Sequence, residues 1–396
     1  MPKYQMHGDV PVWGDVNDPH ALEQMLRCRT TADGGAMMAD HHLGYSVPIG
    51  GVVVYRDRIS PSGVGYDIGC GNKAVRLDVD AAEVRRNIAT LMDDIASNLS
   101  FGMGRRNPTP VEHPLFEPER EEWSHPAIAS LRGMAAKQLG TIGGGNHYVD
   151  LFVDELERVW VGVHFGSRGL GHKTATWFLE KNGAIDAIHA PPLELDVASE
   201  MGAGYIACMR LAGEYAYAGR DWVCAQVARM IGADVVEEVH NHHNFAWHEE
   251  HKGERVWVVR KGATPAWPGQ RGFVGASMGE NAVIVEGIDS EEARLAYRST
   301  VHGAGRAMSR TAAKGRVDRR TGEVRRPGLV SPEMMREWVE RAGVELRGGD
   351  LDEAPQAYKR LDEVLAYHEA SVRVIHTLKP IGVAMAGRDV FDPFKD

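Results

Sequence analysis

Short apolar runs recur along the chain, separated by glycine-rich loops and by longer stretches in which apolar residues follow a helical period. Five of the short runs are rich in Val and other β-branched residues and are bounded by turn-forming residues. This pattern favours buried strands over helices. The predicted strands cover residues 52–55, 73–79, 159–165, 255–261 and 281–287.

Four other segments carry apolar residues at intervals of three and four positions, which is typical of amphipathic helices. The predicted helices cover residues 19–29, 81–99, 220–232 and 354–371. Asp80 directly precedes the second helix and is its expected N-cap. Segment 103–126 is rich in Pro and charge and predicts an irregular connection. Because strands and helices are mixed without strict alternation, we predict one α+β domain over residues 1–396, with β-sheets and flanking helices.

Glycine is frequent, with 45 residues, and it is clustered. The clusters lie at residues 44–55, 62–72, 140–148, 164–172, 261–279 and 301–310. Glycine permits positive φ angles and close approach of one backbone segment to another. Six such loops spread over the chain therefore predict one site assembled from many turns.

The composition is that of a soluble globular protein with a substantial core, with 43% hydrophobic and 25% charged residues. No apolar run is long enough to cross a membrane, and the N-terminus lacks the pattern of a signal peptide. Four cysteines in so long a chain do not form a disulfide framework. We therefore expect a cytoplasmic protein with no membrane partner.

The net charge of −10 argues against general nucleic-acid binding, but the charge is uneven. Segment 306–326 holds eight Lys and Arg residues and two acidic residues, a net charge of +6, which leaves −16 on the rest of the chain. A local basic patch suits an anionic ligand such as phosphate. The alternative is a solvated loop with scattered charge.

The segment DIGCG places the carboxylate of Asp67 three residues before the thiol of Cys70 in a glycine-rich turn. A bent backbone can direct both groups at one ion, and a thiolate can bridge two ions. No second cysteine is nearby, which argues against a four-cysteine zinc site. Alternatively, Cys70 is a small buried apolar residue.

Three histidines are candidate ligands beside this turn. His147 follows Asn146 in a glycine loop, and His164 ends a predicted strand that leads into a loop carrying Arg168. The alternatives are a solvated loop histidine and a satisfied core histidine, respectively. His243 is one of five histidines between residues 240 and 251, where a predicted strand ends. In the same stretch, His248 and His251 fall in a charged run and are expected on the solvated surface.

A mixed set of oxygen, nitrogen and sulfur ligands suits Mn²⁺, Zn²⁺, Co²⁺ or Fe²⁺ better than Mg²⁺ or Ca²⁺. One Asp, one Cys and three His are too many for a single catalytic zinc with an open position. They fit two ions that share the thiolate, an arrangement that suits phosphoryl transfer.

The segment VHGAGRAMSR places His302 before a Gly-Ala-Gly turn. If a helix spans 304–312, Arg306 and Arg310 lie on roughly one face near its positive N-terminus. A histidine beside such donors can attack phosphorus and form a phosphoramidate. The alternative is a turn histidine that caps a helix.

Together these motifs resemble the RtcB family of RNA-splicing ligases, over residues 35–387. The motifs that carry the resemblance are SGVGYDIGCG, GTIGGGNHY, VHFGSRGLGH, HNHHN, RKGATPAWPG, GASMG and VHGAGRAMSR. The resemblance implies an enzyme that joins RNA with a 2′,3′-cyclic phosphate or 3′-phosphate to RNA with a 5′-hydroxyl, using GTP and two Mn²⁺ ions. The implied substrates are tRNA halves or broken RNA, and the activating protein archease is a possible partner of such enzymes.

The resemblance also implies residue roles. The implied metal ligands are Asp67, Cys70, His147, His164 and His243, with Cys70 bridging. His302 matches the histidine that the family guanylylates. The residues at positions that hold the guanine nucleotide are Asn146, Asn244, Ser277, Ala304 and Gly305. Arg168 matches a residue that holds an oxyanion or an RNA phosphate.

The chain departs from the family at three places, which fits a divergent bacterial paralogue. Ala386 stands where the family has a C-terminal lysine that contacts the nucleotide, and residues 388–396 form an extension in which Lys395 is a possible substitute. Asp150 stands where a Glu is expected. We predict that GTP is still preferred over ATP. The competing functions are a metal-dependent phosphoesterase that acts on cyclic or 3′-phosphates and an RNA-end-binding protein that does not ligate.

Overall fold

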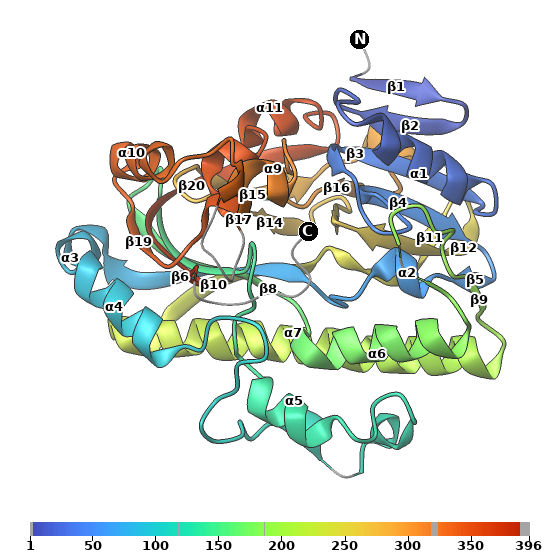
Figure 1. The fold of residues 1–396 in the computed structure, drawn as a ribbon, viewed down its shortest axis with the longest axis horizontal. Coiled ribbons are helices and arrows are strands. Elements are labelled where there is room, and N and C mark those ends of the chain that lie inside the picture. The colour runs from blue at the N-terminus through green and yellow to red at the C-terminus, as the bar shows by residue number, and fades with distance from the viewer. Residues whose placement is uncertain (1–2, 118, 186, 318–323, 389–396) are drawn as a thin grey trace.

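Two β-sheets and a layer of long helices build the molecule. The structure, a computed structural model, describes residues 3–117, 119–185, 187–317 and 324–388. Figure 1 shows both sheets above α6 (Arg168–Lys181) and α7 (Glu200–Ile231), with α5 (Arg132–Gln138) on the outer side of these helices. The α+β fold class predicted from the sequence is confirmed.

The larger sheet has eight strands, in the order β10-β6-β8-β7-β20-β15-β14 with β19 beside β20. The strands are β6 (Gly71–Asp80), β7 (Tyr148–Asp154), β8 (Arg158–Phe165), β10 (Val235–His242), β14 (Arg271–Val274), β15 (Ala282–Gly287), β19 (Glu345–Arg347) and β20 (Val372–Met385). In the antiparallel register of β10, β6 and β8, Gly71 pairs with His242 on one side and with Phe165 on the other. The residues next to these three positions therefore meet at one end of the sheet.

The smaller sheet has six strands, in the order β1-β2-β3-β4-β12-β11. They are β1 (Tyr4–His7), β2 (Val10–Trp13), β3 (Gly34–His42), β4 (Ile49–Tyr55), β11 (Asn244–His251) and β12 (Glu254–Lys261). Three further strand pairs are β5 (Arg58–Ile59) with β9 (Leu195–Asp196), β13 (Ala263–Pro265) with β16 (Ser299–Val301), and β17 (Gly315–Val317) with β18 (Val324–Pro327). His243 alone separates β10 from β11 and so joins the two sheets.

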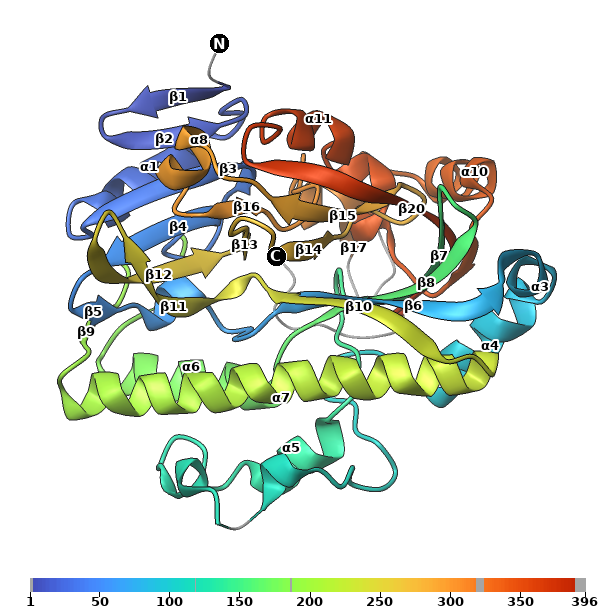
Figure 2. The same cartoon turned by 180° about the vertical axis from the view of Figure 1, so that it is seen from behind.

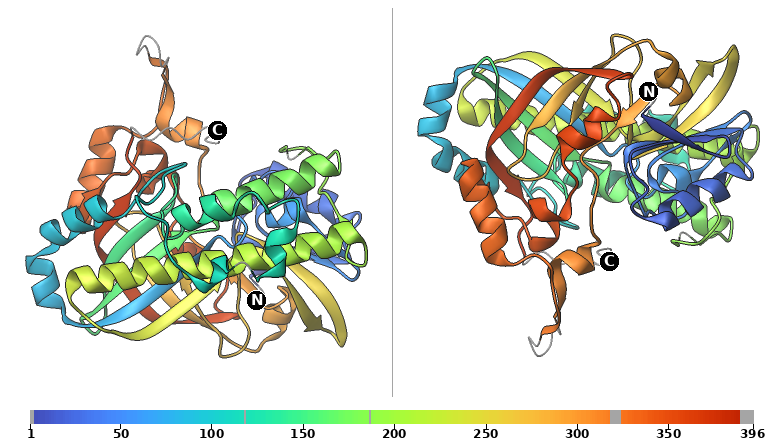
Figure 3. Two further views of the ribbon diagram at one scale, coloured as in Figure 1. Left: turned by 90° about the horizontal axis from the view of Figure 1, so that it is seen from below. Right: turned by 90° about the horizontal axis from the view of Figure 1, so that it is seen from above.

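Helix α7 runs along the underside of both sheets, beside α6 (Figures 2 and 3). It begins at the cap Ser199, whose side chain accepts from the Gly202 N–H, and ends at Gly232 in the left-handed conformation. The other helices are α1 (Pro19–Arg29), α2 (Pro61–Val64), α3 (Ala81–Arg86), α4 (Ile88–Asn98), α8 (Glu291–Leu295), α9 (Arg310–Lys314), α10 (Pro332–Ala342) and α11 (Leu361–Ala366). None of the described helices has the length and apolar character needed to cross a membrane.

Burial of valine explains why these segments form strands and why α7 lies against them. Val161 and Val163 of β8 are fully buried and share a core cluster with Val223 and Val227 of α7. β-Branched side chains fit a pleated surface well, and burying each one contributes roughly 1.5–3 kcal/mol. This packing fixes the long helix directly behind the end of the sheet where the ligand-bearing strands finish.

The strand predictions are confirmed. Four observed strands extend their predicted ranges by one to three residues, and β15 starts one residue later than predicted. The helix predicted at 19–29 is α1. The helix predicted at 81–99 is split by Asn87 into α3 and α4, and the Asp80 carboxylate accepts from the Glu83 N–H as a cap. The described part of segment 103–126 contains the short 3₁₀ turns η1 (Pro114–Phe116) and η2 (Glu121–Ser124), in agreement with an irregular connection.

Two helix predictions need correction. The helix predicted at 220–232 is only the last part of α7, which starts twenty residues earlier. The helix predicted at 354–371 is mostly wrong, because only α11 within it is α-helical. The 3₁₀ turns η3 (Leu351–Glu353) and η4 (Pro355–Ala357) precede α11. His368, counted on a helix, is fully buried, and its Nε2 accepts from the Ala39 N–H of β3 at 3.0 Å.

Candidate active site

A cavity of about 770 Å³ opens where the two sheets meet. Its lining comes from segments that range from Asn17 to Met385 along the chain. The lining includes these predicted site residues: Asp67, Cys70, Asn146, His147, His164, His243, Asn244, Ser277, His302, Ala304 and Gly305. The glycine loops therefore do converge on one place. Arg168 is the one predicted site residue that is not among the residues that line the cavity.

The turn from Asp67 to Cys70 connects α2 to β6 and is closed by the Cys70 N–H, which donates to the Asp67 carbonyl at 3.0 Å. Gly69 in this turn has φ +70°, and a Cβ there would lie 3.1 Å from the Cβ of Ala216 on α7. Only glycine fits without strain at such a position. The close contact of α7 with the turn directs both side chains into the cavity.

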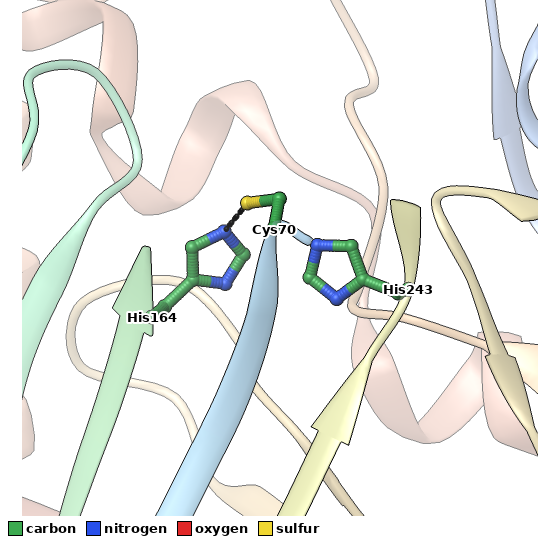
Figure 4. A group of neighbouring side chains, drawn as sticks. All are labelled: Cys70, His164 and His243. Carbon is green, nitrogen blue, oxygen red and sulfur yellow. Dashed lines mark hydrogen bonds between the residues drawn. The ribbon is translucent and has the colours of Figure 1, made fainter. Parts of the chain in front are cut away.

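Cys70, His164 and His243 form a buried cluster at the end of the larger sheet (Figure 4). The Cys70 Sγ lies 3.4 Å from His164 Nε2, and the rings of His164 and His243 have centroids 5.1 Å apart. One potential ligand atom from each of the three residues lies within 4.8 Å of the others. The His243 N–H donates to the Cys70 carbonyl at 2.8 Å, which holds the third ligand against the first.

Asp67, Cys70 and His147 form a second cluster that shares the same sulfur. His147 Nε2 lies 3.1 Å from the Asp67 Oδ2 and 3.7 Å from the Cys70 Sγ. Two adjacent clusters with one common thiol have the donor set expected for two ions bridged by a thiolate. The buried Nδ1 atom of His243 has no hydrogen-bond partner, as expected of a group that a metal would satisfy.

The electrostatics of the clusters suit metal binding. Burial lowers the pKa of His164 and of His243 well below the usual value, so both rings are neutral, the form that ligates a metal. Burial raises the pKa of the Cys70 thiol, which loses its proton when a metal binds. Burial alone would raise the pKa of Asp67, but hydrogen bonding and the charge of His147 lower it to about 2, so this carboxylate is ionised.

His302 follows β16 and lies beside the buried cluster, with its ring centroid 4.9 Å from that of His243. Its Nδ1 is 2.5 Å from the Oδ2 of Asp40, and its backbone N–H donates to the same oxygen at 2.9 Å. Asp40 is fully buried in β3. Burial alone would raise the pKa of Asp40, but the charge and hydrogen bonds of His302 lower it below the usual value. The carboxylate can only accept at this contact, so in the neutral form of the ring the proton lies on Nδ1 and the lone pair on Nε2.

Asp40 was missed by the sequence analysis. The available signal was a single carboxylate within an otherwise apolar, buried run, GGAMMAD. A buried charge needs a partner, so this run predicts that some cation or donor contacts Asp40. The pattern does not say that the donor is His302, which lies far along the chain.

The prediction of a helix over residues 304–312 is wrong, because α9 begins only at Arg310, after the cap Ser309. Gly305 instead has φ +74°, and a Cβ there would lie 2.2 Å from the Asp40 carbonyl, so this loop passes directly over β3. Arg306 and Arg310 consequently do not share a helix face.

Two arginines of the basic segment 306–326 contact the acidic residues Asp352 and Glu353. Arg306 donates to the Asp352 carbonyl at 2.7 Å, Arg310 lies 3.0 Å from the Asp352 carboxylate, and both arginines pair with Glu353. Part of the positive charge predicted for an anionic ligand is therefore balanced within the protein. Arg319 and Arg320 lie outside the described residues.

The residues predicted to hold a nucleotide line the cavity but have different local roles. Asn244 Oδ1 accepts from the Gly262 N–H at 2.7 Å, and the Ser277 hydroxyl donates to Glu280 at 2.8 Å. Asp150 also lines the cavity, and burial holds the pKa of its carboxyl group well above the usual value.

Arg168 lies behind the His147 loop instead of in the cavity. Its guanidinium donates to the Gly102 carbonyl at 2.9 Å and to the Thr141 hydroxyl at 3.2 Å. A Cβ at Gly143 would lie 2.0 Å from His147 Nδ1 and 2.6 Å from an Arg168 nitrogen. Both side chains therefore pack directly against Gly143. Arg168 thus contacts the loop that carries a predicted ligand.

The remaining predictions have mixed outcomes. His248 is exposed as predicted, whereas the prediction for His251 is wrong, because its side chain is 8% exposed and lies 2.9 Å from Glu249. Ala386 follows β20 and is not part of the described cavity lining, although Val383 and Met385 are. Lys395 and most of the predicted extension lie outside the described residues.

Comparisons with known proteins agree on one family. The model of the family described as tRNA-splicing ligase RtcB matches residues 22–124 and 119–386. The chain is 32% identical over 378 residues to the RNA-splicing ligase RtcB1 of an Escherichia coli strain, covering 87% of this chain and 88% of that protein. It is also 32% identical to the tRNA-splicing ligase RtcB of Thermococcus kodakarensis, covering 97% and 96%, and of Archaeoglobus fulgidus, covering 93% and 92%.

Proposed function

We infer the function from one premise, namely that the chain belongs to the RtcB family of tRNA-splicing ligases. It is an RNA ligase of this family. We propose that it joins RNA carrying a 2′,3′-cyclic phosphate or a 3′-phosphate to RNA carrying a 5′-hydroxyl, with GTP as the co-substrate and Mn²⁺ as the metal. The observation that carries the proposal is the position of His302, which is held by Asp40 at the edge of a metal-binding cluster.

His302 is the proposed nucleophile. Because Asp40 accepts the Nδ1 proton, the Nε2 lone pair is available, as an attacking imidazole requires. Nε2 forms a bond to the α-phosphorus of GTP, the α–β phosphoanhydride bond breaks, and pyrophosphate leaves. The Asp40 carboxylate also offsets the positive charge that the imidazole gains during the attack, as the carboxylate of a catalytic triad does.

Two clusters are proposed to hold the metal ions. Asp67 and His147 would hold one ion and His164 and His243 the other, with Cys70 shared. When bound, the ions supply neutralisation of the phosphate charge. The protein contributes rigid strand ends that fix the ligands and, at the cavity rim, Asn146, Asn244 and Ser277 as candidate contacts of the nucleotide.

The later steps follow from the same groups. Water opens a cyclic phosphate to a 3′-monophosphate, whose oxygen then attacks the phosphorus on His302 and takes the GMP. The 5′-hydroxyl of the second RNA attacks the activated 3′-phosphate, a new phosphodiester forms, and GMP leaves. Orientation and electrostatic stabilisation by fixed groups supply most of the acceleration in such transfers.

The first test is covalent labelling. Purified protein is incubated with α-labelled GTP and Mn²⁺, denatured and examined for protein-bound label, beside His302→Ala and a matched control, His248→Ala, which alters an exposed histidine on β11. We expect label on the wild type and on His248→Ala only, and weaker label when ATP replaces GTP. Equal labelling by ATP would contradict the nucleotide preference.

The same experiment separates the competing functions. No label with any metal, together with opening of a cyclic phosphate, would replace the ligase by a metal-dependent phosphoesterase, because that reaction needs the clusters but not His302. Binding of RNA ends without label or hydrolysis would support the third function, an RNA-end-binding protein that does not ligate. Label followed by joined RNA would establish the ligase.

We further propose that residues 1–396 form one catalytic domain, since segments from both ends of the described chain line the cavity. A cytoplasmic location is supported by four free cysteines, because a reducing compartment keeps thiols free. Broken RNA or tRNA halves are the proposed substrates, and archease is a proposed partner. Addition of archease to the labelling reaction tests the last point.

A further inference from the structure

Arg220 is a fully buried arginine on α7 that lies behind the metal-binding clusters. Within the described part of the chain, no carboxylate lies within 4.0 Å of its guanidinium. Its side chain does not line the cavity, so it does not contact a bound substrate. A buried arginine without an ion-pair partner is costly, which indicates that its hydrogen bonds serve a purpose.

The guanidinium contacts polar atoms of four residues from different segments. One terminal nitrogen donates to the Gly69 carbonyl at 3.0 Å and to the Phe165 carbonyl at 2.6 Å. The other lies 3.0 Å from His242 Nδ1, and Nε donates to His240 Nε2 at 2.9 Å. Since arginine cannot accept a hydrogen bond, His240 Nε2 is the acceptor of its contact, whereas His242 Nδ1 lies 2.9 Å from the Gly69 carbonyl as well.

Three of the four contacted residues are immediate chain neighbours of the ligands in the buried cluster. Gly69 precedes Cys70, Phe165 follows His164 and His242 precedes His243. The three segments are distant in sequence, and the pairing of β10, β6 and β8 sets their register up to Gly71, His242 and Phe165. One planar group that contacts all three ends fixes the distances between them.

We propose that Arg220 is a positioning residue that sets the spacing of Cys70, His164 and His243 and thereby the affinity of this cluster for its metal ion. The inference rests on the proposed function for the identity of the ligands. Residues that orient metal ligands without binding the metal themselves support its affinity, and their removal lowers the affinity by about 10- to 100-fold.

The surroundings hold the guanidinium in one plane. Its central carbon lies 5.2 Å from the ring centroid of Tyr217, and this ring also stacks on His242 with centroids 3.8 Å apart. His240 in turn lies 3.3 Å from the Asp221 carboxylate, which orients the fourth contacted residue. A rigid fork of donors suits this task, whereas a lysine offers a single flexible ammonium group at the same charge.

The test compares Arg220→Lys and Arg220→Gln with wild-type protein in titrations with Co²⁺, which reports thiolate and imidazole coordination through its visible and near-ultraviolet absorption. Arg260→Lys is the matched control. Arg260 is also fully buried, but it lies on β12, pairs with Glu249 and has no contact with the clusters. Far-ultraviolet circular dichroism and thermal unfolding establish that each variant is folded.

We expect wild type and Arg260→Lys to bind two Co²⁺ ions with the same spectrum. Arg220→Lys and Arg220→Gln should bind one ion about 10- to 100-fold more weakly, with an altered thiolate-to-cobalt band. A folded Arg220→Lys with wild-type affinity and spectrum would overturn the positioning role, because charge alone would then suffice. Failure of the wild type itself to bind metal would instead contradict the proposed function.

His242→Phe provides a second variant in case Arg220 is needed for folding. Phenylalanine keeps the stacking on Tyr217 but removes the contact between Arg220 and the Nδ1 atom next to His243. We expect the same loss of affinity for one ion, to a smaller extent, since two of the three contacts remain. Unchanged Co²⁺ affinity and spectrum in folded His242→Phe would overturn the inference.

Discussion

The Nδ1 atom of His302 and the Oδ2 atom of Asp40 are 2.5 Å apart, although the two residues are separated by 262 positions in the chain. The same carboxylate oxygen accepts from the His302 N–H at 2.9 Å. The two contacts fix both the ring orientation and the loop that carries it. In the neutral ring the nitrogen without a proton is then Nε2, which is the atom that we propose attacks phosphorus.

Asp40→Asn is therefore expected to slow the proposed guanylylation of His302 while the protein stays folded. An asparagine that turns its NH₂ group to Nδ1 selects the opposite tautomer, in which Nε2 carries the proton and cannot attack. In comparable triads this change costs about 10⁴-fold in rate, and we expect a loss of about 10²- to 10⁴-fold. The measurement is the initial rate of covalent labelling with α-labelled GTP.

Metal binding is the internal control for Asp40→Asn, because Asp40 contacts neither cluster. The variant should retain the Co²⁺ affinity and spectrum of the wild type. Labelling at the wild-type rate would show that the contact with Asp40 is structural and does not determine reactivity.

Cys70 is the only residue shared by the two clusters, which gives a second prediction. Cys70→Ala should weaken binding of both ions, by at least about tenfold, since loss of a ligand costs no less than loss of a supporting contact. His243→Ala should weaken the binding of only one ion, and Asp67→Asn should weaken the binding of only the other ion. Calorimetric or absorption titration with Co²⁺ resolves the two events. Selective loss of one ion in Cys70→Ala would rule out a bridging role for the thiolate.

The candidate ligands were predictable from the sequence because each lies at the end of a locally encoded strand. The apolar runs define β6, β8 and β10, and Cys70, His164 and His243 lie at or next to the ends of these strands. Short motifs with glycine turns preserve this placement without long-range information. The same local logic explains why strand existence was predicted better than helix length.

Contacts between distant segments were not predictable from the pattern. Asp40 reaches His302 across the junction of the two sheets, and Arg220 reaches Gly69 across 151 positions from α7 to the ligand-bearing turn. Residues 354–371 have helical periodicity, yet His368 is held under β3 and Pro355 starts a 3₁₀ turn. In each case tertiary burial decided the outcome over local propensity.

Glu249 in the smaller sheet gives a prediction about stability and pH. Its carboxylate accepts from both terminal nitrogens of the buried Arg260, at 2.9 and 2.8 Å, and His251 lies 2.9 Å away. Burial alone would raise the pKa of Glu249, but the charge of Arg260, with hydrogen bonds from His251 and Arg260, lowers it from 4.5 to about 2. The ionised form is therefore favoured in the folded state.

A carboxylate whose pKa is lower in the folded state stabilises the protein above its unfolded pKa, and the contribution is lost as the pH falls towards the folded pKa. For Glu249 this stabilising contribution is lost as the pH falls from about 4.5 to about 2. Glu249→Gln should lower the free energy of unfolding at pH 7 by up to roughly 3 kcal/mol. Because only the wild type loses this contribution in acid, the difference between the two proteins should shrink as the pH falls below 4.5.

Urea unfolding of wild type and Glu249→Gln between pH 7 and pH 3 measures this difference. Glu254→Gln is the matched control, since Glu254 pairs with Arg56 on the surface, where both side chains are more than half exposed. Exposed pairs contribute only about 0–1 kcal/mol, so this control should unfold close to the wild type at every pH. A difference between Glu249→Gln and wild type that stays constant down to pH 3 would show that the lost stability comes from packing around Arg260 and not from the charge of Glu249.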